Sequence, residues 1–202
     1  MAKIKLTKTE LKSQRDALKQ YTRFLPTLQL KKQQLQLEMR LCLERIAENE
    51  KREAASRDSL RSWIALFGDP GTADRVVRAL HVEKVRTGLM NIAGVDVPVY
   101  EGVDFQVESY DLFQEEPWLD DALDAVRAVV ELRSERDVIR EQYERIAKEL
   151  RVTTQRVNLF EKIKIPETKE NIRLINIAIG DADTSAVVRS KIVKKKLEEP
   201  AA

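Results

Sequence analysis

Apolar residues recur with coiled-coil spacing in two long segments of the chain, one near each end. In each segment one series repeats every seven residues, and a second series follows it by three or four residues. This spacing places both series along one side of a helix and predicts a left-handed coiled coil. The first segment carries Leu11, Leu18, Leu25, Lys32, Met39 and Ile46 with Tyr21, Leu28, Leu35 and Cys42; the second carries Leu132, Ile139, Ile146, Thr153 and Phe160 with Tyr143, Leu150 and Val157.

Residues that break helices are concentrated between the two segments. Five of the six glycines and three of the six prolines lie between residues 68 and 117. The chain is therefore expected to fold back there, so that its flanks pair antiparallel. Pro26 and Pro166 are expected to bend or restart the flanking helices. The predicted fold is mainly α, with an N-terminal helix over 1–67, a central head over 68–117, a C-terminal helix over 118–197 and a disordered tail over 198–202.

The stretch NIAGVDVPVYEG, at residues 91–102, is the one strand-like part of the chain. Valines alternate with other residues before and after the Glu101-Gly102 pair, which predicts a β-hairpin over about residues 94–108. A three-residue loop, Tyr100 to Gly102, sets Val99 opposite Val103 and keeps one face apolar. The hairpin residues of interest are Gly94, Val95, Val97, Pro98, Val99, Gly102 and Phe105, with Val97 opposite Phe105.

An isolated hairpin is marginally stable in water, so its apolar face must pack on another part of the chain. The large apolar residues Trp63, Phe67 and Trp118 flank the head in the sequence. We expect the hairpin to pack on the helix ends around them and to cap the helix pair.

Composition favours an extended helical protein over a thick globular core. Charged residues make up 35% of the chain and aromatic residues 5%, against about 25% charged residues in ordinary domains. The 36 basic and 34 acidic residues are interspersed and give a net charge of +2, so they do not predict binding to nucleic acid or lipid. One cysteine and no long apolar run are typical of a soluble, uncleaved cytoplasmic chain.

Candidate chemical sites are weak. The segment GDPGT at 68–72 lacks the spacing and the lysine of a P-loop and is better explained as a turn. His81 has no second histidine or cysteine nearby for a metal site, and Cys42 lies in the apolar series, as a buried small residue would. The acidic pairs Glu115-Glu116 and Asp120-Asp121 suit a helix start. We expect no catalytic residues, no cofactor and no metal.

Three segments resemble the D subunit of the V-type (vacuolar/archaeal-type) rotary ATPases. They are KLTKTELKSQRDALK at 5–19, NIAGVDVPVYE at 91–101 and TTQRVNLFEKIKIPETKENI at 153–172, and the resemblance covers nearly the whole chain. Residues 23–35 resemble the bacterial branch. The most specific positions are Arg156, Val157, Asn158 and Glu161 before Ile165-Pro166, and Ala93, Gly94, Val95, Pro98 and Val99. The sequence departs from the family pattern around Gly180.

This resemblance implies a non-catalytic central rotor stalk. In the family, the D subunit transmits torque between a ring of catalytic and regulatory subunits, called A and B, and the membrane ion-translocating rotor. The small F subunit of the rotor packs against the stalk, and the head sits on the membrane-proximal C/d subunit. The implied location is cytoplasmic and peripheral to the inner membrane, without membrane insertion. A non-rotary coiled-coil tether or adaptor is the alternative, and mixed charges on the helices disfavour a nucleic-acid binder.

Two groups of residues are candidates for contacts with other subunits, beside the resemblance-derived Arg156, Val157, Asn158 and Glu161. The first group lies outside the apolar series of the first helix and requires a further covering surface, either the head or the F subunit. The second is a group of terminal lysines, which serves either as a solvated helix end or as an electrostatic bearing against the ring. The first group is Leu30, Leu37, Leu41 and Leu43; the second is Lys191, Lys194, Lys195 and Lys196, expected to meet Lys3, Lys5, Lys8 and Lys12.

Overall fold

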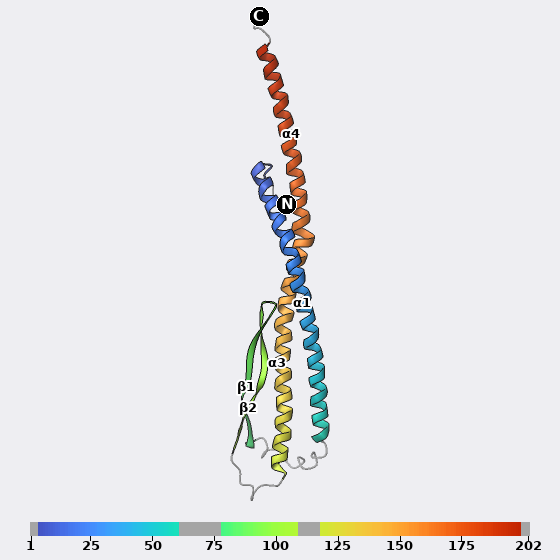
Figure 1. The fold of residues 1–202 in the computed structure, drawn as a ribbon, viewed down its shortest axis with the longest axis vertical. Coiled ribbons are helices and arrows are strands. Elements are labelled where there is room, and N and C mark those ends of the chain that lie inside the picture. Colours follow the sequence, from blue (N-terminus) through green and yellow to red (C-terminus); the bar gives the residue numbers. More distant parts are fainter. Residues whose placement is uncertain (1–3, 61–77, 109–117, 199–202) are drawn as a thin grey trace. The chain divides into compact units, whose positions relative to one another are not determined.

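The structure is a computed structural model that describes residues 4–60, 78–108 and 118–198. The described residues fall into two compact units. The central unit is Gln33–Arg151, and the terminal unit joins the residues up to Lys32 with those from Val152 onward. The elements are α1 (Lys8–Leu60), β1 (Leu80–Ile92), β2 (Val95–Val107), α3 (Leu119–Asn158), the π-helix η2 (Leu159–Lys164) and α4 (Ile165–Glu198), as Figure 1 shows. The prediction of a mainly helical fold with a central hairpin is confirmed.

Helix α1 begins at a capped turn and continues through a proline. The Thr7 hydroxyl accepts a hydrogen bond from the Glu10 backbone N–H at 3.2 Å, which satisfies one of the free donors at a helix start. Pro26 lies inside the helix and leaves the carbonyl of Thr22 without its helical donor. Both residues are exposed, so water can hydrate that carbonyl and the helix need not end there.

In the central unit, α1 and α3 pack antiparallel. The Asn49 side-chain amide donates to Glu135 at 2.8 Å, and an Arg140 guanidinium N–H donates to Glu50 at 3.2 Å. The two helices meet through the apolar series, as the predicted fold-back requires. The core of the unit contains Leu35, Cys42, Val97, Ile139 and Ile146, with Met39, Ile46, Tyr143 and Leu150 packed against it. Apart from Val97, all of these residues belong to the predicted apolar series.

The hairpin has a different register from the one predicted. Its turn is the pair Ala93 and Gly94, with φ angles of 50° and 80°, as expected for a two-residue turn that matches strand twist. Val97 lies opposite Met90, and Val99 lies opposite Gly88. The prediction of a loop at residues 100–102 is therefore wrong. The two apolar runs that were expected to pair with each other form one continuous strand, β2, and its partner β1 lies mostly before the stretch 91–102 and ends at Ile92.

Gly102 lies at a bulge in β2 rather than in a loop. Arg86 pairs with Gly102 and Thr87 pairs with Tyr100, which leaves Glu101 as the extra residue. Gly102 has a φ of 150°, a value that side-chain-bearing residues rarely adopt. Such bulges increase the local twist of a strand pair.

The hairpin lies along the helices instead of capping their ends. At its turn, Ile92, Ala93 and Val95 pack against the core of the central unit. At its open end, Ala79 and Leu80 pack with a second cluster on α3, and Figure 1 shows both strands running beside that helix. Trp118 packs at the second cluster as expected, whereas Trp63 and Phe67 lie outside the described residues. The second α3 cluster comprises Leu119, Ala122, Leu123 and Val126.

In the terminal unit, α1 packs antiparallel to α4. The Lys8 ammonium lies 3.8 Å from the Asp183 carboxylate, and the rings of Tyr21 and Phe160 have centroids 5.1 Å apart. The predicted proximity of the first and last helical segments is thus confirmed within this unit. Ile175 is fully buried and Thr168 nearly so.

The π-helix η2 shifts the buried face of the C-terminal segment by one residue. Ile146 and Thr153 are buried, and Phe160 continues their seven-residue series on the seam with Tyr21. The next buried residue, Thr168, comes eight positions after Phe160. A π turn accommodates one extra residue in this way, and the Ile165 N–H donates to the carbonyl of Phe160. The expected interruption near Pro166 therefore takes the form of a change in helix type.

Candidate functional site

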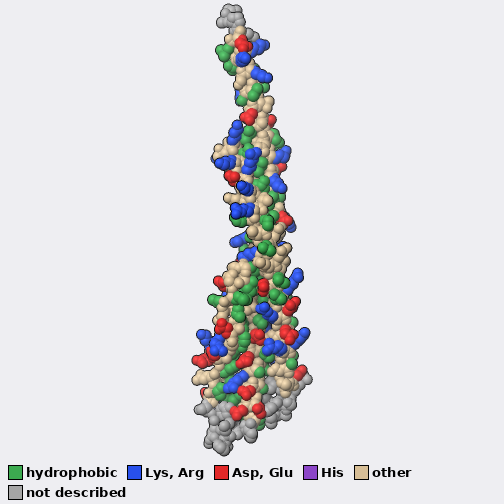
Figure 2. Space-filling view, viewed as in Figure 1, with side chains coloured by type: hydrophobic (Ala, Val, Ile, Leu, Met, Phe, Trp, Pro, Cys, Tyr) green, Lys and Arg blue, Asp and Glu red, His purple; other side chains and the backbone are tan. Residues whose placement is uncertain are grey.

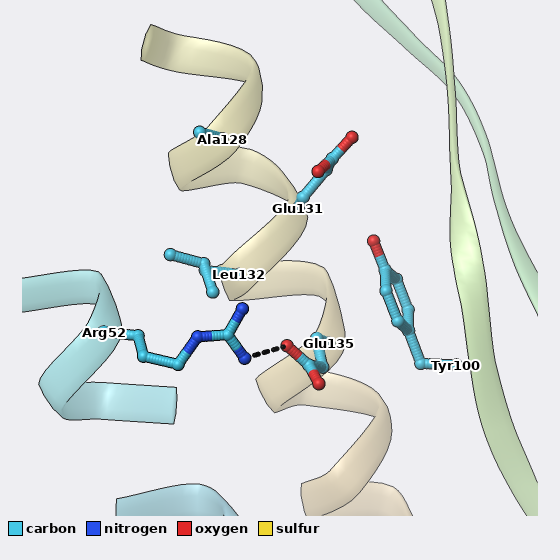
Figure 3. A pocket seen from close by; sticks show the side chains of 6 residues that line it. All are labelled: Arg52, Tyr100, Ala128, Glu131, Leu132 and Glu135. Atoms are coloured by element: carbon cyan, nitrogen blue, oxygen red, sulfur yellow. Dashed lines mark hydrogen bonds and ion pairs between the residues drawn. The ribbon is translucent and has the colours of Figure 1, made fainter. Parts of the chain in front are cut away.

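A cleft in the central unit joins three elements (Figure 3). Arg52 comes from α1, Tyr100 from β2, and Glu131 and Glu135 from α3, with Ala128 and Leu132 completing the lining. Its volume is about 370 Å³. An Arg52 guanidinium nitrogen lies 3.5 Å from a Glu135 carboxylate oxygen, and the Asn49 amide donates to the same oxygen at 2.8 Å.

The electrostatics of this cleft keep Tyr100 protonated. Burial raises the pKa of Tyr100, the carboxylates of Glu131 and Glu135 raise it further, and Arg86 opposes them. A phenol with a raised pKa stays protonated at neutral pH, so its oxygen is not available as a general base. Arg52 and Asn49 of α1 already bind Glu135 of α3, so these polar groups of the cleft connect the two helices.

The surroundings of two other candidate chemical residues, Cys42 and His81, favour structural roles. Cys42 is buried, and burial raises the pKa of its thiol, which suits the predicted packing role. The His81 ring nitrogen lies 3.8 Å from the exposed Glu108 carboxylate. Within the described ranges, no group of three or more His, Cys, Asp or Glu side chains is placed to hold a metal ion.

The predicted leucine group of α1 lies outside the packed face of the helix. In the central unit Leu37 and Leu43 are 56% and 48% exposed, and Leu41 is partly buried. In the terminal unit Leu30 is also largely exposed. These large apolar side chains therefore remain in contact with water. Figure 2 shows apolar, basic and acidic side chains interspersed on one face of the molecule.

The residues near η2 that carry the family resemblance differ in their exposure to solvent. Val157 is 3% exposed and belongs to the packed face. Arg156, Asn158 and Glu161 are exposed. Exposed apolar residues that sequence reasoning missed lie on the same stretch: Leu159, Ile163, Leu174 and Ile177. These four residues fall outside the seven-residue series. An apolar residue outside the series was the sequence signal that could have identified them.

A groove of about 930 Å³ in the terminal unit lies between the segment before α1 and the start of α4. Ile4 and Lys5 line one side, and Ile163, Pro166 and Leu174 are among the residues on the other. The segment before the Thr7 cap therefore lies against η2 and α4.

The C-terminal lysines lie apart from this groove. Lys191, Lys194 and Lys195 are exposed, as is every described residue from Gly180 onward. The prediction that the lysines of both termini meet is wrong for Lys5, which lies in the groove with Lys162. Lys8 instead faces Asp183, because α1 starts there and α4 continues past it; Lys3 lies outside the described residues.

No helix in the described part of the chain combines the length and apolar character needed to cross a bilayer. The long helices pair through an apolar seam, and several ion pairs join α1 to α3 or α4. The helix pairing defines the class as a mainly helical protein with a two-stranded hairpin.

The particular family follows from comparison with known proteins. The chain belongs to the family of ATP synthase D subunits, whose model matches residues 10–195. It is 38% identical to the V-type ATP synthase D subunit of Borreliella burgdorferi, over 98% of this chain and 96% of that protein. It is 33% identical to the D subunit of Chlamydia pneumoniae, over 96% and 93% of the two chains. The corresponding protein of Chlamydia trachomatis serovar L2 is 32% identical over 98% of each chain.

Proposed function

We propose that this chain is the non-catalytic central rotor stalk of a V-type ATP synthase and transmits torque between its catalytic ring and its membrane rotor. The observation that carries the proposal is antiparallel helix pairing in both units of a chain that belongs to the D-subunit family. From Leu119 to Glu198 the second segment of this pairing is helical without a break. Close-packed seams resist deformation, as torque transmission requires.

Three surfaces are proposed to contact other subunits. The exposed apolar side of α1 is assigned to the small F subunit of the rotor, because burying leucines is favourable at about 25 cal/mol per Å². The C-terminal end of α4 is assigned to the A and B subunits of the ring, and the head to the membrane-proximal C/d subunit. The exposed residues Arg156 and Asn158 at the end of α3 and Glu161 in η2 complete the candidate contacts. The α1 surface contains Leu30, Leu37 and Leu41; the α4 surface contains Lys191, Lys194 and Lys195.

A reversible cross-link tests whether the chain must turn. In the assembled complex, Lys194→Cys in a Cys42→Ala background would be attached to the ring with a disulfide-containing photo-cross-linker. ATP turnover should fall in proportion to cross-linking and recover on reduction. The matched control is Lys84→Cys on β1, whose cross-links to co-rotating subunits should leave turnover unchanged.

The tether alternative gives different results in two measurements. Full ATP turnover with the stalk cross-linked to the ring would contradict a rotating role. Size-exclusion chromatography with light scattering adds a second measurement on the isolated chain. A monomer that binds the F subunit one to one supports the rotor, and a stable homodimer that does not bind it supports the tether.

A further inference from the structure

The apolar seam of α1 ends in polar residues that are nevertheless buried. The series through Cys42 reaches Asn49 seven residues later, and the series through Ile46 reaches Glu53. Asn49 is 2% exposed and Glu53 is 5% exposed. Two consecutive seam positions in the central unit therefore hold polar side chains where the repeat calls for apolar ones.

Glu53 is held by three guanidinium groups. Arg136 donates to one carboxylate oxygen at 2.6 Å, and Arg133 donates to the other at 2.9 Å. Arg57, one turn further along α1, lies 2.6 Å from that second oxygen. Two of the three partners thus come from α3, and they bind different oxygens of one buried carboxylate.

An apolar heptad seam does not by itself fix how far one helix is displaced along the other. A slip of seven residues, about 10 Å along the axis, replaces one apolar seam residue by the next. Leu132, Ile139 and Ile146 would exchange places with little change in chemistry. The apolar series therefore leaves several registers of similar free energy.

The polar seam positions Asn49 and Glu53 make these registers differ in free energy. A slip in one direction replaces Arg133 and Arg136 by Val126 and Val129, so the Glu53 carboxylate loses both of its α3 partners and keeps Arg57 of its own helix. Removing partners from a buried charge is destabilising.

A slip in the other direction also carries a penalty. It places Arg140 and Tyr143 at those two positions, so one of the two guanidinium partners from α3 is lost. It also replaces Glu135, the charged acceptor for Asn49, by the neutral Gln142.

The buried polar cluster has a feature that is expected where one helix register is favoured at some cost in stability. The side-chain oxygen of Asn49 is buried and has no hydrogen-bond partner among the described residues. Buried polar groups in helix pairs can fix register while contributing little net stability. We propose that Glu53, bound by Arg133 and Arg136, selects the axial register of α1 against α3. This inference does not depend on a rotary role.

The test measures register directly in the full-length chain. Spin labels at Lys51→Cys and Lys148→Cys, both exposed positions, would report the distance between α1 and α3 in a Cys42→Ala background. The informative variants are Glu53→Gln and the double change Glu53→Leu with Arg136→Leu, which supplies an apolar seam instead of an unpaired charge. Glu50→Gln is the matched control, because it removes the exposed ion pair to Arg140.

The parent and Glu50→Gln should give one narrow distance. The double variant should remain helical by circular dichroism yet show a second distance, displaced by close to 10 Å as expected for a seven-residue slip. An unchanged single distance in the double variant would overturn the proposal. Loss of helical structure in that variant would also overturn it, since the cluster would then be required for pairing itself.

Discussion

The Gln142 side-chain amide on α3 donates a hydrogen bond to the backbone carbonyl of Pro98 on β2. Gln142 is 4% exposed, and its side-chain oxygen lies 4.0 Å from the Cys42 sulfur on α1. Nearby, Arg145 donates to the backbone carbonyl of Asp96 at 3.1 Å. Two carbonyls on the free edge of β2 are thus bound by α3 side chains, which attaches the hairpin to the helix pair and satisfies an otherwise open strand edge.

Replacing Gln142 with Leu should loosen the hairpin. The buried Pro98 carbonyl would lose its donor, at a cost of about 1–3 kcal/mol in the free energy of unfolding. Urea unfolding gives that free energy, and amide hydrogen exchange of β2 should accelerate more than exchange of α3. Glu141→Gln is the control, since Glu141 contacts Arg145 in an exposed pair, and its change should stay within about 0.5 kcal/mol. Equal unfolding free energies for Gln142→Leu and Glu141→Gln would contradict the role given to Gln142.

The helices could be predicted from the sequence because their signal is local and redundant. Many seam residues repeat the same spacing, so one exception such as Lys32 does not change the interpretation. The hairpin turn was missed because β1 is mostly exposed and its apolar residues do not alternate regularly with polar ones. Glu101-Gly102 looked like a loop because a bulge and a loop both favour glycine.

The ionic part of the seam was missed for a different reason. Asn49 and Glu53 continue the two α1 series, but two polar residues at consecutive seam positions give no apolar signal there. Only the structure shows that Arg133 and Arg136 reach Glu53 from α3. Predicting an ion pair between residues far apart in sequence requires knowing which faces of the two helices are in contact.

Gly102→Ala should destabilise the hairpin through the backbone. Gly102 has a φ of 150°, and a Cβ there would lie 2.9 Å from the Arg86 guanidinium. The flexible Arg86 side chain can move, so the backbone conformation is the main cost, about 1 kcal/mol or more. Thermal unfolding followed by circular dichroism measures it. A variant as stable as the parent would show that the bulge can adopt an ordinary conformation.

Gly180→Ala should stabilise the helix, in contrast to the destabilising Gly102→Ala. Gly180 lies inside α4, and a Cβ there meets no atom within 4 Å. Alanine favours the helix by about 1 kcal/mol over glycine at such an exposed position. Hydrogen exchange of residues 176–190 should slow relative to the parent. Faster exchange would mean that the segment is not a stable helix in the isolated chain.

The stability conferred by Glu53 should decline in acid. The hydrogen bond from Arg133 lowers the pKa of Glu53, with charge interactions from Arg57 and Arg136 acting in the same direction and burial opposing them. Because the folded pKa lies below the unfolded value of about 4.3, the ionised carboxylate stabilises the folded state above that pH. The contribution is lost as pH falls through the lowered folded value.

Urea unfolding of the wild-type chain and of Glu53→Gln between pH 7 and pH 3 tests this linkage. The difference in unfolding free energy between them should be constant above about pH 5 and should shrink as the pH approaches 3, because the glutamine variant has no proton to bind at this site. Glu50→Gln serves as the control, since its partner Arg140 and Glu50 itself are both half exposed and such pairs contribute little. Parallel pH profiles for wild type and Glu53→Gln would contradict a stabilising ionised Glu53 in the folded chain.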